Sequence, residues 1–320
     1  MKPNNAAKGY LFALLAALFL STTAIFIRHL TETYQTPALV LAFWRDVFVV
    51  LTLLPVFTVF HPRLLLVSRA NLRYLVGYGL VLAFFNALWT LSVALNGAAV
   101  ATVLVYCSAA FTALLGWWLL REPLGWGKMA AVIFSLAGCV LVAEAYDPAS
   151  WHVNPGGIFA GVLAGLAYAV YSMMGRSAAG RGLSPWTTLL YTFGFAGVFL
   201  LFANLLPGGP LPGSAVHARD LMWLGSAWAG WLVLFLLAAV PTVLGFGLYN
   251  VSLSHLPSSV ANLIVTMEPA FTSVTAYLLL GERLTPVQIA GGLVILAGVV
   301  ILRMFGERSP VNVAHSVEAT

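Results

Sequence analysis

The sequence predicts an all-α membrane protein in which ten transmembrane helices form two inverted five-helix repeats around a central cavity. Three observations support this prediction: the composition, the number of long apolar segments, and a match between the two halves of the chain. Hydrophobic residues make up 61% of the 320 residues and charged residues only 8%. A soluble globular protein has about 25% charged residues, so these few charges cannot cover the surface of a soluble fold. Most of the surface is therefore expected to face lipid.

Ten apolar segments are long enough to cross a bilayer, which requires about 20 apolar residues in a helix. Their predicted limits are 9–28, 37–60, 74–95, 98–120, 126–144, 156–175, 185–206, 231–254, 258–281 and 286–304. The segments are too long for β-barrel strands and lack the apolar/polar alternation of such strands. The first segment follows two lysines, as a signal peptide would. Its length, and the nine segments after it, identify it as the first helix of the mature protein.

The positive charges favour an orientation with both termini in the cytoplasm. With the N-terminus inside, eleven Lys and Arg residues fall in inside segments and one, Arg45, falls within a span. Only Arg28, Arg219 and Arg283 fall outside. This asymmetry predicts a multi-pass protein of a bacterial-type inner membrane. It differs from the basic groove of a nucleic-acid-binding protein, so no nucleic-acid partner is expected.

The two halves of the chain match when one is shifted by 160 residues. Residues 98–142 and 258–302 share 15 identities in 45 positions without a gap. The shared residues include Ala-Phe-Thr, a loop glutamate (Glu122 and Glu282) and a late Leu-Ala-Gly. A duplication of one ancestral unit explains this match better than shared apolar composition does.

The match divides the chain into three predicted parts. Residues 1–150 form the first repeat with spans one to five, and residues 151–308 form the second repeat with spans six to ten. Residues 309–320 form a cytoplasmic tail. Because five is odd, the second repeat must cross the membrane in the opposite orientation. Inverted repeats of this kind place a substrate site near the bilayer midplane and support alternating access.

The repeat ends carry a family motif. Residues 267–272 read Met-Glu-Pro-Ala-Phe-Thr, residues 279–284 read Leu-Leu-Gly-Glu-Arg-Leu, and residues 119–124 read Leu-Leu-Arg-Glu-Pro-Leu. This pattern resembles the fourth and fifth helices of a repeat in the drug/metabolite transporter superfamily, EamA type. The resemblance covers essentially the whole chain. It implies a ten-helix exporter of amino acids, aromatic ones included, or of related small metabolites.

Glu268 is the carboxyl most expected to act in transport. It lies near the middle of the ninth span and precedes Pro269, which has no N–H and therefore frees the carbonyl of Val265. A carboxyl beside such an unwound turn could bind a substrate ammonium or carry a proton, and intramembrane carboxyls are often functional. The alternative is a hydrogen bond that only joins two helices.

Arg45 and Asp46 are the other two charges deep within a span. Adjacent side chains on a helix diverge by about 100°, so each residue is expected to have another partner. Arg45 could attract a substrate carboxylate. A structural ion pair that joins helices is the favoured interpretation.

Polar and aromatic residues inside the spans predict a cavity for a bulky side chain. On the third span Tyr78, Phe85, Asn86 and Trp89 share one helical face. The alternative is ordinary helix packing. The predicted substrate-binding residues are Trp44, Tyr78, Phe85, Asn86, Trp89, Tyr106, Tyr168, Tyr249 and Glu268.

Small residues at a spacing of four predict close helix packing on the sixth span. Gly157, Gly161 and Gly165 lie on one face there, and glycines at this spacing allow two helices to approach closely.

Other function classes lack sequence support. No catalytic or phosphate-binding motif is present, so the chain is not expected to be an enzyme. No Cys/His cluster has metal-ligand spacing, and no cofactor is implied. Two alternatives remain: an exporter of lipophilic cations, and a membrane sensor or assembly protein without transport. Because one chain holds both repeats, a monomer is sufficient.

Overall fold

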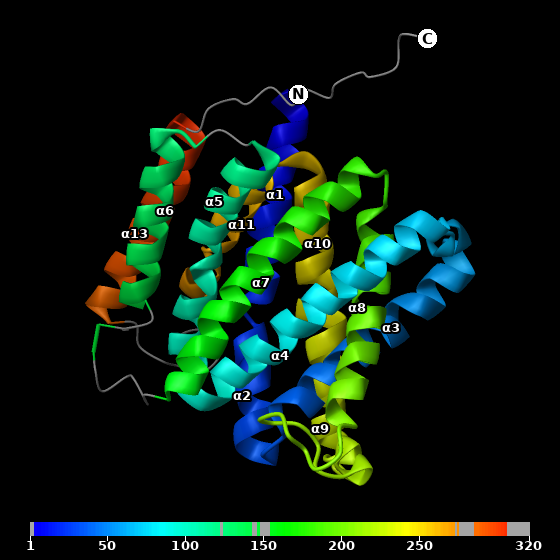
Figure 1. The fold of residues 1–320 in the computed structure, drawn as a ribbon. Helices are drawn as coiled ribbons and strands as arrows, with labels where there is room; N and C mark the ends of the chain where they lie inside the picture. Colours follow the sequence, from blue (N-terminus) through cyan, green and yellow to red (C-terminus); the bar gives the residue numbers. More distant parts are fainter. Residues whose placement is uncertain are drawn as a thin grey trace, which may run out of the picture.

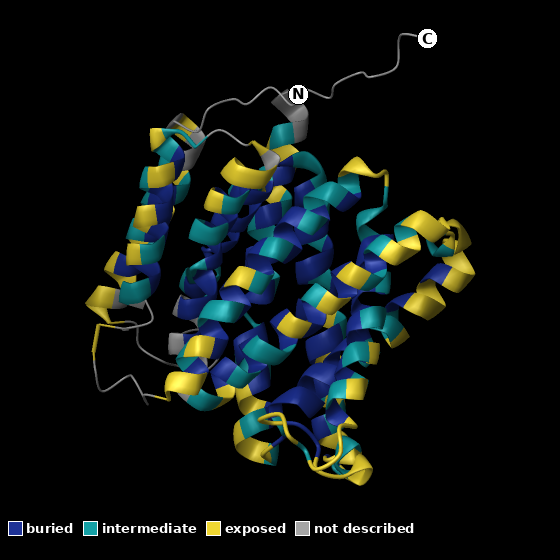
Figure 2. Cartoon of the chain, in the orientation of Figure 1, coloured by how far each residue is buried: buried dark blue, intermediate teal, exposed yellow. Residues whose placement is uncertain are grey.

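The computed structural model is an all-helical bundle. It describes residues 3–121, 124–142, 146–147, 154–272, 274 and 285–305. The helices lie side by side, with the N-terminus at one end of the bundle (Figure 1). Exposed positions on the outer faces include large apolar side chains such as Trp118 and Trp126, whereas Arg45 and Asp46 are buried (Figure 2). This distribution matches a bundle whose outer surface faces lipid.

The helices follow the predicted spans closely. The first half contains α1 (Pro3–Leu20), α2 (Thr23–Tyr34), α3 (Ala38–Phe60), the 3-10 helix η1 (Pro62–Leu65), α4 (Arg69–Tyr106), α5 (Ser108–Leu120) and α6 (Trp126–Val142). The second half contains α7 (Pro155–Gly180), α8 (Pro185–Asn204), the 3-10 helix η3 (Ala218–Met222), α9 (Trp228–Leu237), the π-helix η4 (Ala238–Thr242), α10 (Val243–His255), α11 (Ser258–Val265) and α13 (Pro286–Phe305).

Among the described residues, six helical stretches are long and apolar enough to cross a membrane. They are Ala6–Thr33, Ala38–Phe60, Arg69–Leu95, Pro155–Gly180, Pro185–Asn204 and Trp228–His255. Three shorter apolar helices correspond to the fourth, fifth and tenth predicted spans: Leu104–Leu119, Trp126–Leu141 and Ile289–Ile301. The ninth predicted span, 258–281, is described as far as residue 272 and at residue 274. The prediction of an all-helical, multi-span membrane protein is confirmed.

The first predicted span is not one uninterrupted helix. The helix breaks at Ser21 and Thr22, between α1 and α2. The hydroxyl of Ser21 donates to the carbonyl of Leu18 at 2.6 Å, and that of Thr22 donates to Phe19 at 2.9 Å. Side-chain hydrogen bonds of this type compete with the backbone ladder and favour an interruption.

The predicted boundary between the third and fourth spans was placed wrongly. Helix α4 continues through residues 96–97 to Tyr106, and the interruption falls instead at Cys107. The Cys107 amide donates to the carbonyl of Leu104, three residues earlier, which tightens the last turn and ends the α-helical pattern.

The interruption predicted beside Pro269 is confirmed. Helix α11 ends at Val265, residues 266–267 form a turn, and residues 268–272 are helical again. The amide of Met267 donates to the carbonyl of Ile264 at 3.1 Å, again in the tighter 3-10 pattern. Proline supplies no N–H to the carbonyl of Val265, so the ladder cannot pass through this point unbroken.

Close approach of α7 to α4 and α5 is also confirmed. A Cβ on Gly161 would lie 2.7 Å from Ser92 Oγ, and one on Gly165 would lie 3.1 Å from the carbonyl oxygen of Leu104. The Ser92 hydroxyl donates to the carbonyl of Gly157 at 2.9 Å. All three glycines therefore face the neighbouring helices, as their spacing predicts.

Several predicted features lie outside the described residues. These are Glu122 and Glu282 of the repeat match, the motif at 279–284, and the tail at 309–320.

Candidate substrate site

A cavity of about 40 Å³ lies in the centre of the bundle. It is lined by Leu20, Thr23, Arg45, Phe85, Trp89, Val105, Tyr106, Tyr168, Phe246 and Glu268. That volume is sufficient for water but far below the roughly 300–1,000 Å³ of a typical ligand pocket. The helices therefore close around this site, and a substrate would require them to separate.

The interruptions at Ser21–Thr22, Cys107 and Thr266–Met267 meet at this cavity. Thr23 follows the first interruption, Tyr106 precedes the second at Cys107, and Glu268 follows the third. The turns at Cys107 and Met267 are 160 residues apart, which is the shift that relates the two halves of the sequence. Interrupted helices at membrane depth occur where backbone lines a cavity, and transporters build substrate sites from them.

The buried charge on Arg45 is only partly neutralised. Arg45 Nε lies 3.7 Å from Asp46 Oδ1, beyond hydrogen-bond distance. Both carboxylate oxygens of Asp46 accept from Asn86 Nδ2 at 2.9 Å, so Asp46 has the second partner that helical geometry predicts. Within the described part of the chain, Nε and Nη2 of Arg45 have no hydrogen-bond partner. The guanidinium lies 5.9 Å from the ring centroid of Trp89, within range of a cation–π contact.

A hydroxyl beside the cavity is also without a partner. Thr23 Oγ1 is buried and makes no hydrogen bond to any residue that the structure describes. Buried polar groups in native proteins are nearly always hydrogen-bonded, and exceptions often mark a functional site. Thr23 and Arg45 both line the cavity, so their free hydrogen-bonding groups are available to a molecule bound there.

Glu268 lies in a short segment tied to the first half of the chain. Tyr106, from that half, lines the same cavity as the Glu268 side chain. The Thr272 hydroxyl lies 3.0 Å from the carbonyl of Glu268 and 3.0 Å from that of Ser21, and thus ties the third interruption to the first. The backbone that carries Glu268 at the cavity wall is thus joined to the first half of the chain.

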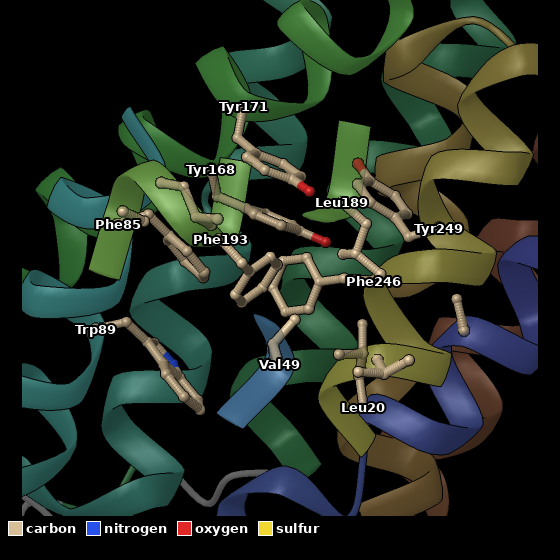
Figure 3. Packing of buried hydrophobic residues seen from close by; sticks show 14 of the residues in the cluster. Leu20, Val49, Phe85, Trp89, Tyr168, Tyr171, Leu189, Phe193, Phe246 and Tyr249 are labelled. Carbon is tan, nitrogen blue, oxygen red and sulfur yellow. The ribbon is translucent and has the colours of Figure 1, made fainter. Parts of the chain in front are cut away.

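Aromatic rings form one side of the cavity (Figure 3). The Phe85 ring stacks on Tyr168 with 5.0 Å between centroids, and Tyr168 stacks on Tyr249 at 5.6 Å. Phe246 packs edge-on against Phe193 at 5.3 Å. Aromatic pairs of this geometry add about 0.5–1.5 kcal/mol to simple burial, so this wall is rigid and apolar.

A chain of buried hydrogen bonds lies beside the aromatic wall and joins four helices. Ser108 Oγ of α5 donates to Asn262 Oδ1 of α11 at 3.2 Å. Asn262 Nδ2 donates to Ser172 Oγ of α7 at 3.2 Å, and Ser172 Oγ lies 2.6 Å from the Tyr249 hydroxyl of α10. The network links the first half of the chain to the second.

Five of the nine predicted substrate-binding residues line the cavity: Phe85, Trp89, Tyr106, Tyr168 and Glu268. Three others lie behind this first layer. Asn86 binds Asp46, Tyr249 stacks on Tyr168, and Tyr78 packs against Tyr171 at 4.8 Å.

Trp44 lies away from the cavity. Its indole N–H donates to the carbonyl of Leu221 at 2.6 Å, and its ring packs against Trp231. This is the environment of a tryptophan near a span end rather than of a cavity residue.

The set of site residues predicted from the sequence lacks five residues that line the cavity: Leu20, Thr23, Arg45, Val105 and Phe246. Arg45 carried a usable signal, an unbalanced charge within a span, but the ion-pair interpretation was preferred. For Phe246 the signal was weaker: Pro241, inside the π-helix η4, precedes it on the same predicted span.

Comparison with known proteins places this geometry in context. The EamA-like transporter family matches residues 7–143 and again residues 155–304. An uncharacterized transporter of Archaeoglobus fulgidus is 26% identical over 289 residues, covering 90% of this chain and 93% of the relative. A probable amino-acid metabolite efflux pump of Salmonella typhimurium is 26% identical and covers 77% of this chain and 82% of the relative. The threonine/homoserine exporter RhtA of the same species is 28% identical, with 72% and 70% covered.

A solved crystal structure shares the fold. It superposes with a TM-score of 0.73 at 14% identity and covers 93% of this chain and 97% of the other. At that identity the likeness concerns the fold alone.

Proposed function

Because the chain belongs to the EamA-like transporter family, we propose that it exports amino acids, including those with aromatic side chains, by alternating access. The observation that carries the proposal is a single cavity with aromatic walls that holds an incompletely paired Arg45 and the carboxyl of Glu268. An amino acid is a zwitterion, so opposite charges in one small site match both of its ends.

Arg45 is the proposed partner of the substrate carboxylate. Guanidinium groups bind carboxylates through two parallel N–H···O bonds, and two nitrogens of Arg45 have no partner in the described residues. Trp89 holds the guanidinium from its face and leaves its edge for the ligand. The hydroxyl of Thr23 is a further donor at the same cavity.

Glu268 is the proposed partner of the substrate ammonium. Ionised, it offers acceptors to the ammonium; protonated, it loses that charge. Proton and substrate would therefore compete for one carboxyl. Such competition lets a proton moving inward displace a substrate moving outward, which is the linkage that proton-driven export needs.

The aromatic wall favours bulky side chains. Phe85, Trp89, Tyr168 and Phe246 present ring faces and edges to the cavity, which suit stacking with an aromatic substrate. The known relatives include an exporter whose name specifies threonine and homoserine, so smaller substrates are included in the proposal.

Two five-helix repeats would supply the alternating access. The double match of the family, at 7–143 and 155–304, supports repeats at 1–150 and 151–308. The interruptions 160 residues apart support the same division. We infer inverted orientation from the odd number of spans, and both termini in the cytoplasm from the positive charges. A monomer suffices for this mechanism.

The alternative of a lipophilic-cation exporter is less favoured. A cation in this cavity would meet the charge of Arg45, and like charges at close range repel. The aromatic walls and Glu268 alone would suit a cation, so competition experiments with both substrate classes separate the two functions.

The test is uptake of radiolabelled amino acids by sealed proteoliposomes, with and without an imposed pH gradient. We expect saturable uptake that the gradient drives, and loss of that drive in Glu268→Gln. If saturable uptake has the same rate with and without the gradient, and in wild type and Glu268→Gln, then Glu268 has only a structural role and the protein is a uniporter. Absence of amino acid flux in sealed vesicles would contradict the proposal and leave the cation exporter or a non-transport role.

A further inference from the structure

A second hollow, separate from the aromatic cavity, lies where α3 turns back into α4. Its volume is about 790 Å³, within the range of ligand pockets. It is lined by Leu53, Val56, Phe57, Phe60, His61, Pro62, Arg63, Leu64, Ser184 and Trp186. We refer to it as the α3–α8 groove. It shares no residue with the proposed amino acid site.

The long wall of the groove is apolar. Leu53, Val56, Phe57 and Phe60 recur at helical spacing along the last two turns of α3, so they form one continuous stripe. Leu53 and Phe57 are buried, whereas Phe60 is 70% exposed. An apolar stripe of this length follows the direction of an acyl chain within a bilayer.

The end wall is fixed in place by α8. The Thr187 hydroxyl donates to the carbonyl of Leu64 at 2.9 Å, and the Tyr191 hydroxyl donates to that of Leu65 at 2.7 Å. Both bonds hold the 3-10 helix η1 against α8. The groove is therefore part of the rigid fold, and Arg63, on η1, is held at its mouth.

Arg63 supplies an unbalanced positive charge. Its side chain is exposed, and it makes no ion pair or hydrogen bond with any residue that the structure describes. Arg69 and Arg73 follow on the first turns of α4. Clustered cations beside spans on the cytoplasmic side attract the phosphates of anionic lipids.

The geometry points to a binding site for an anionic phospholipid in the α3–α8 groove. One acyl chain lies along the apolar stripe of α3, and the headgroup phosphate pairs with Arg63. A second protein copy or a peptide would cover the stripe equally well, but neither accounts for an unpaired cation at its end. Zwitterionic lipids carry no net charge to match that cation, so the site selects by charge.

Trp186 connects this groove to the substrate cavity. Its ring forms part of the groove and packs so closely on α10 that a Cβ at Gly247 would lie 2.6 Å from it. The preceding residue, Phe246, lines the substrate cavity. A bound lipid would thus press on the helix that forms the aromatic wall.

The test measures lipid binding and is independent of transport. Purified full-length protein is titrated with phosphatidylglycerol or phosphatidylcholine, and retained lipid is counted by native mass spectrometry. Wild type should retain phosphatidylglycerol preferentially. Arg63→Gln should lower that retention about fivefold, and Arg63→Lys should preserve most of it. Arg121→Gln removes a charge from the end of α5, away from the groove, and should leave retention unchanged.

Brominated lipid locates the bound molecule. Bromine quenches nearby tryptophan fluorescence, so phosphatidylglycerol with brominated chains should quench wild type more than Trp186→Phe. Three results would each overturn the proposal. The first is equal retention of the two lipids by wild type, and the second is an equal loss of retention in Arg63→Gln and Arg121→Gln. The third is equal quenching in wild type and Trp186→Phe. A dimer that shields Trp186 would show instead that a second copy fills the groove.

Discussion

Arg45 Nε lies 3.7 Å from Oδ1 of Asp46, its neighbour in the chain, while Asn86 holds both oxygens of that carboxylate at 2.9 Å. The carboxylate is thus bonded from one side and the guanidinium is left with free N–H groups at the cavity. The arrangement neutralises the buried charge of Arg45 only in part and leaves its donors unused. An ion pair that served only to join helices would leave no donors unused.

Double substitution separates the structural part of Arg45 from its proposed role in binding. Arg45→Met leaves Asp46 buried without its cation, and breaking a buried pair in this way costs about 3–5 kcal/mol. The combined Arg45→Met and Asp46→Asn variant removes both charges and should recover most of the lost thermal stability in detergent. Its KM for amino acid uptake should still be at least about tenfold higher, because a charge-assisted hydrogen bond contributes about 1.5–3 kcal/mol.

One result for the double variant would contradict a binding role for Arg45. If the double variant is stable and keeps the wild-type KM, Arg45 acts only within the ion pair. In that case the substrate carboxylate must bind elsewhere.

The all-helical, multi-span architecture could be predicted from the sequence because bilayer thickness sets the length of each apolar segment. The limits were less predictable, since α4 runs through the predicted boundary between the third and fourth spans. The interruption beside Pro269 was also predictable, since proline leaves a carbonyl without its donor. The break at Ser21 depends on which hydrogen bond a short hydroxyl makes, and the turn at Cys107 depends on tertiary packing. Neither is specified by local composition.

The wrong placement of Trp44 has a similar cause. Trp44 was expected well inside the span, but it lies in the second turn of α3, and the rotation of α3 about its axis directs its ring toward the loop at Leu221. That rotation is set by contacts such as the bond to Leu221, 177 residues away in sequence. Phe85 and Trp89 do line the cavity, and they share a helical face with Asn86, which is buried and bonded to Asp46.

The hydrogen-bond network at Asn262 should stabilise the closed state in which the structure lies. Asn262→Leu keeps the volume but leaves the hydroxyls of Ser108 and Ser172 with fewer partners, a loss of about 1–3 kcal/mol. Thermal unfolding in detergent measures this cost. Thr112→Val is the matched control, because Thr112 Oγ1 is buried without a hydrogen-bond partner in the described residues. It should be neutral or stabilising, and equal losses in the two variants would contradict the assigned role of the network.

Asp220, in the loop before α9, gives a pH prediction outside the spans. Hydrogen bonds from the backbone amide of His217 at 2.8 Å and that of Val216 at 3.1 Å hold the pKa of this carboxyl below its usual value. Because the pKa of Asp220 is lower in the folded loop than in the unfolded chain, the ionised carboxylate stabilises the loop at pH values above the ordinary Asp pKa. This stabilisation is lost as the pH falls through the lowered pKa. Hydrogen exchange of residues 214–224, corrected for intrinsic rates, should therefore show constant protection from pH 8 to 5. Asp220→Asn should lower protection across that range, and protection that falls between pH 8 and 5 in wild type would refute the assignment.

Gly77 and Gly79 lie on opposite faces of α4 and should respond oppositely to substitution by alanine. A Cβ on Gly79 would lie 2.4 Å from Phe195 Cβ and 3.0 Å from the carbonyl oxygen of Thr192, so α4 and α8 would have to move apart. Overpacking of this kind costs about 1–3 kcal/mol. Gly77 has no atom within 4 Å of the same position, and alanine there should stabilise the helix by up to about 1 kcal/mol. Thermal unfolding of Gly79→Ala and Gly77→Ala in one detergent compares them directly. Equal stability of the two variants would mean that α4 and α8 are not held at the close distance seen in the structure. In that case α8 would not restrain the part of the cavity wall that α4 forms.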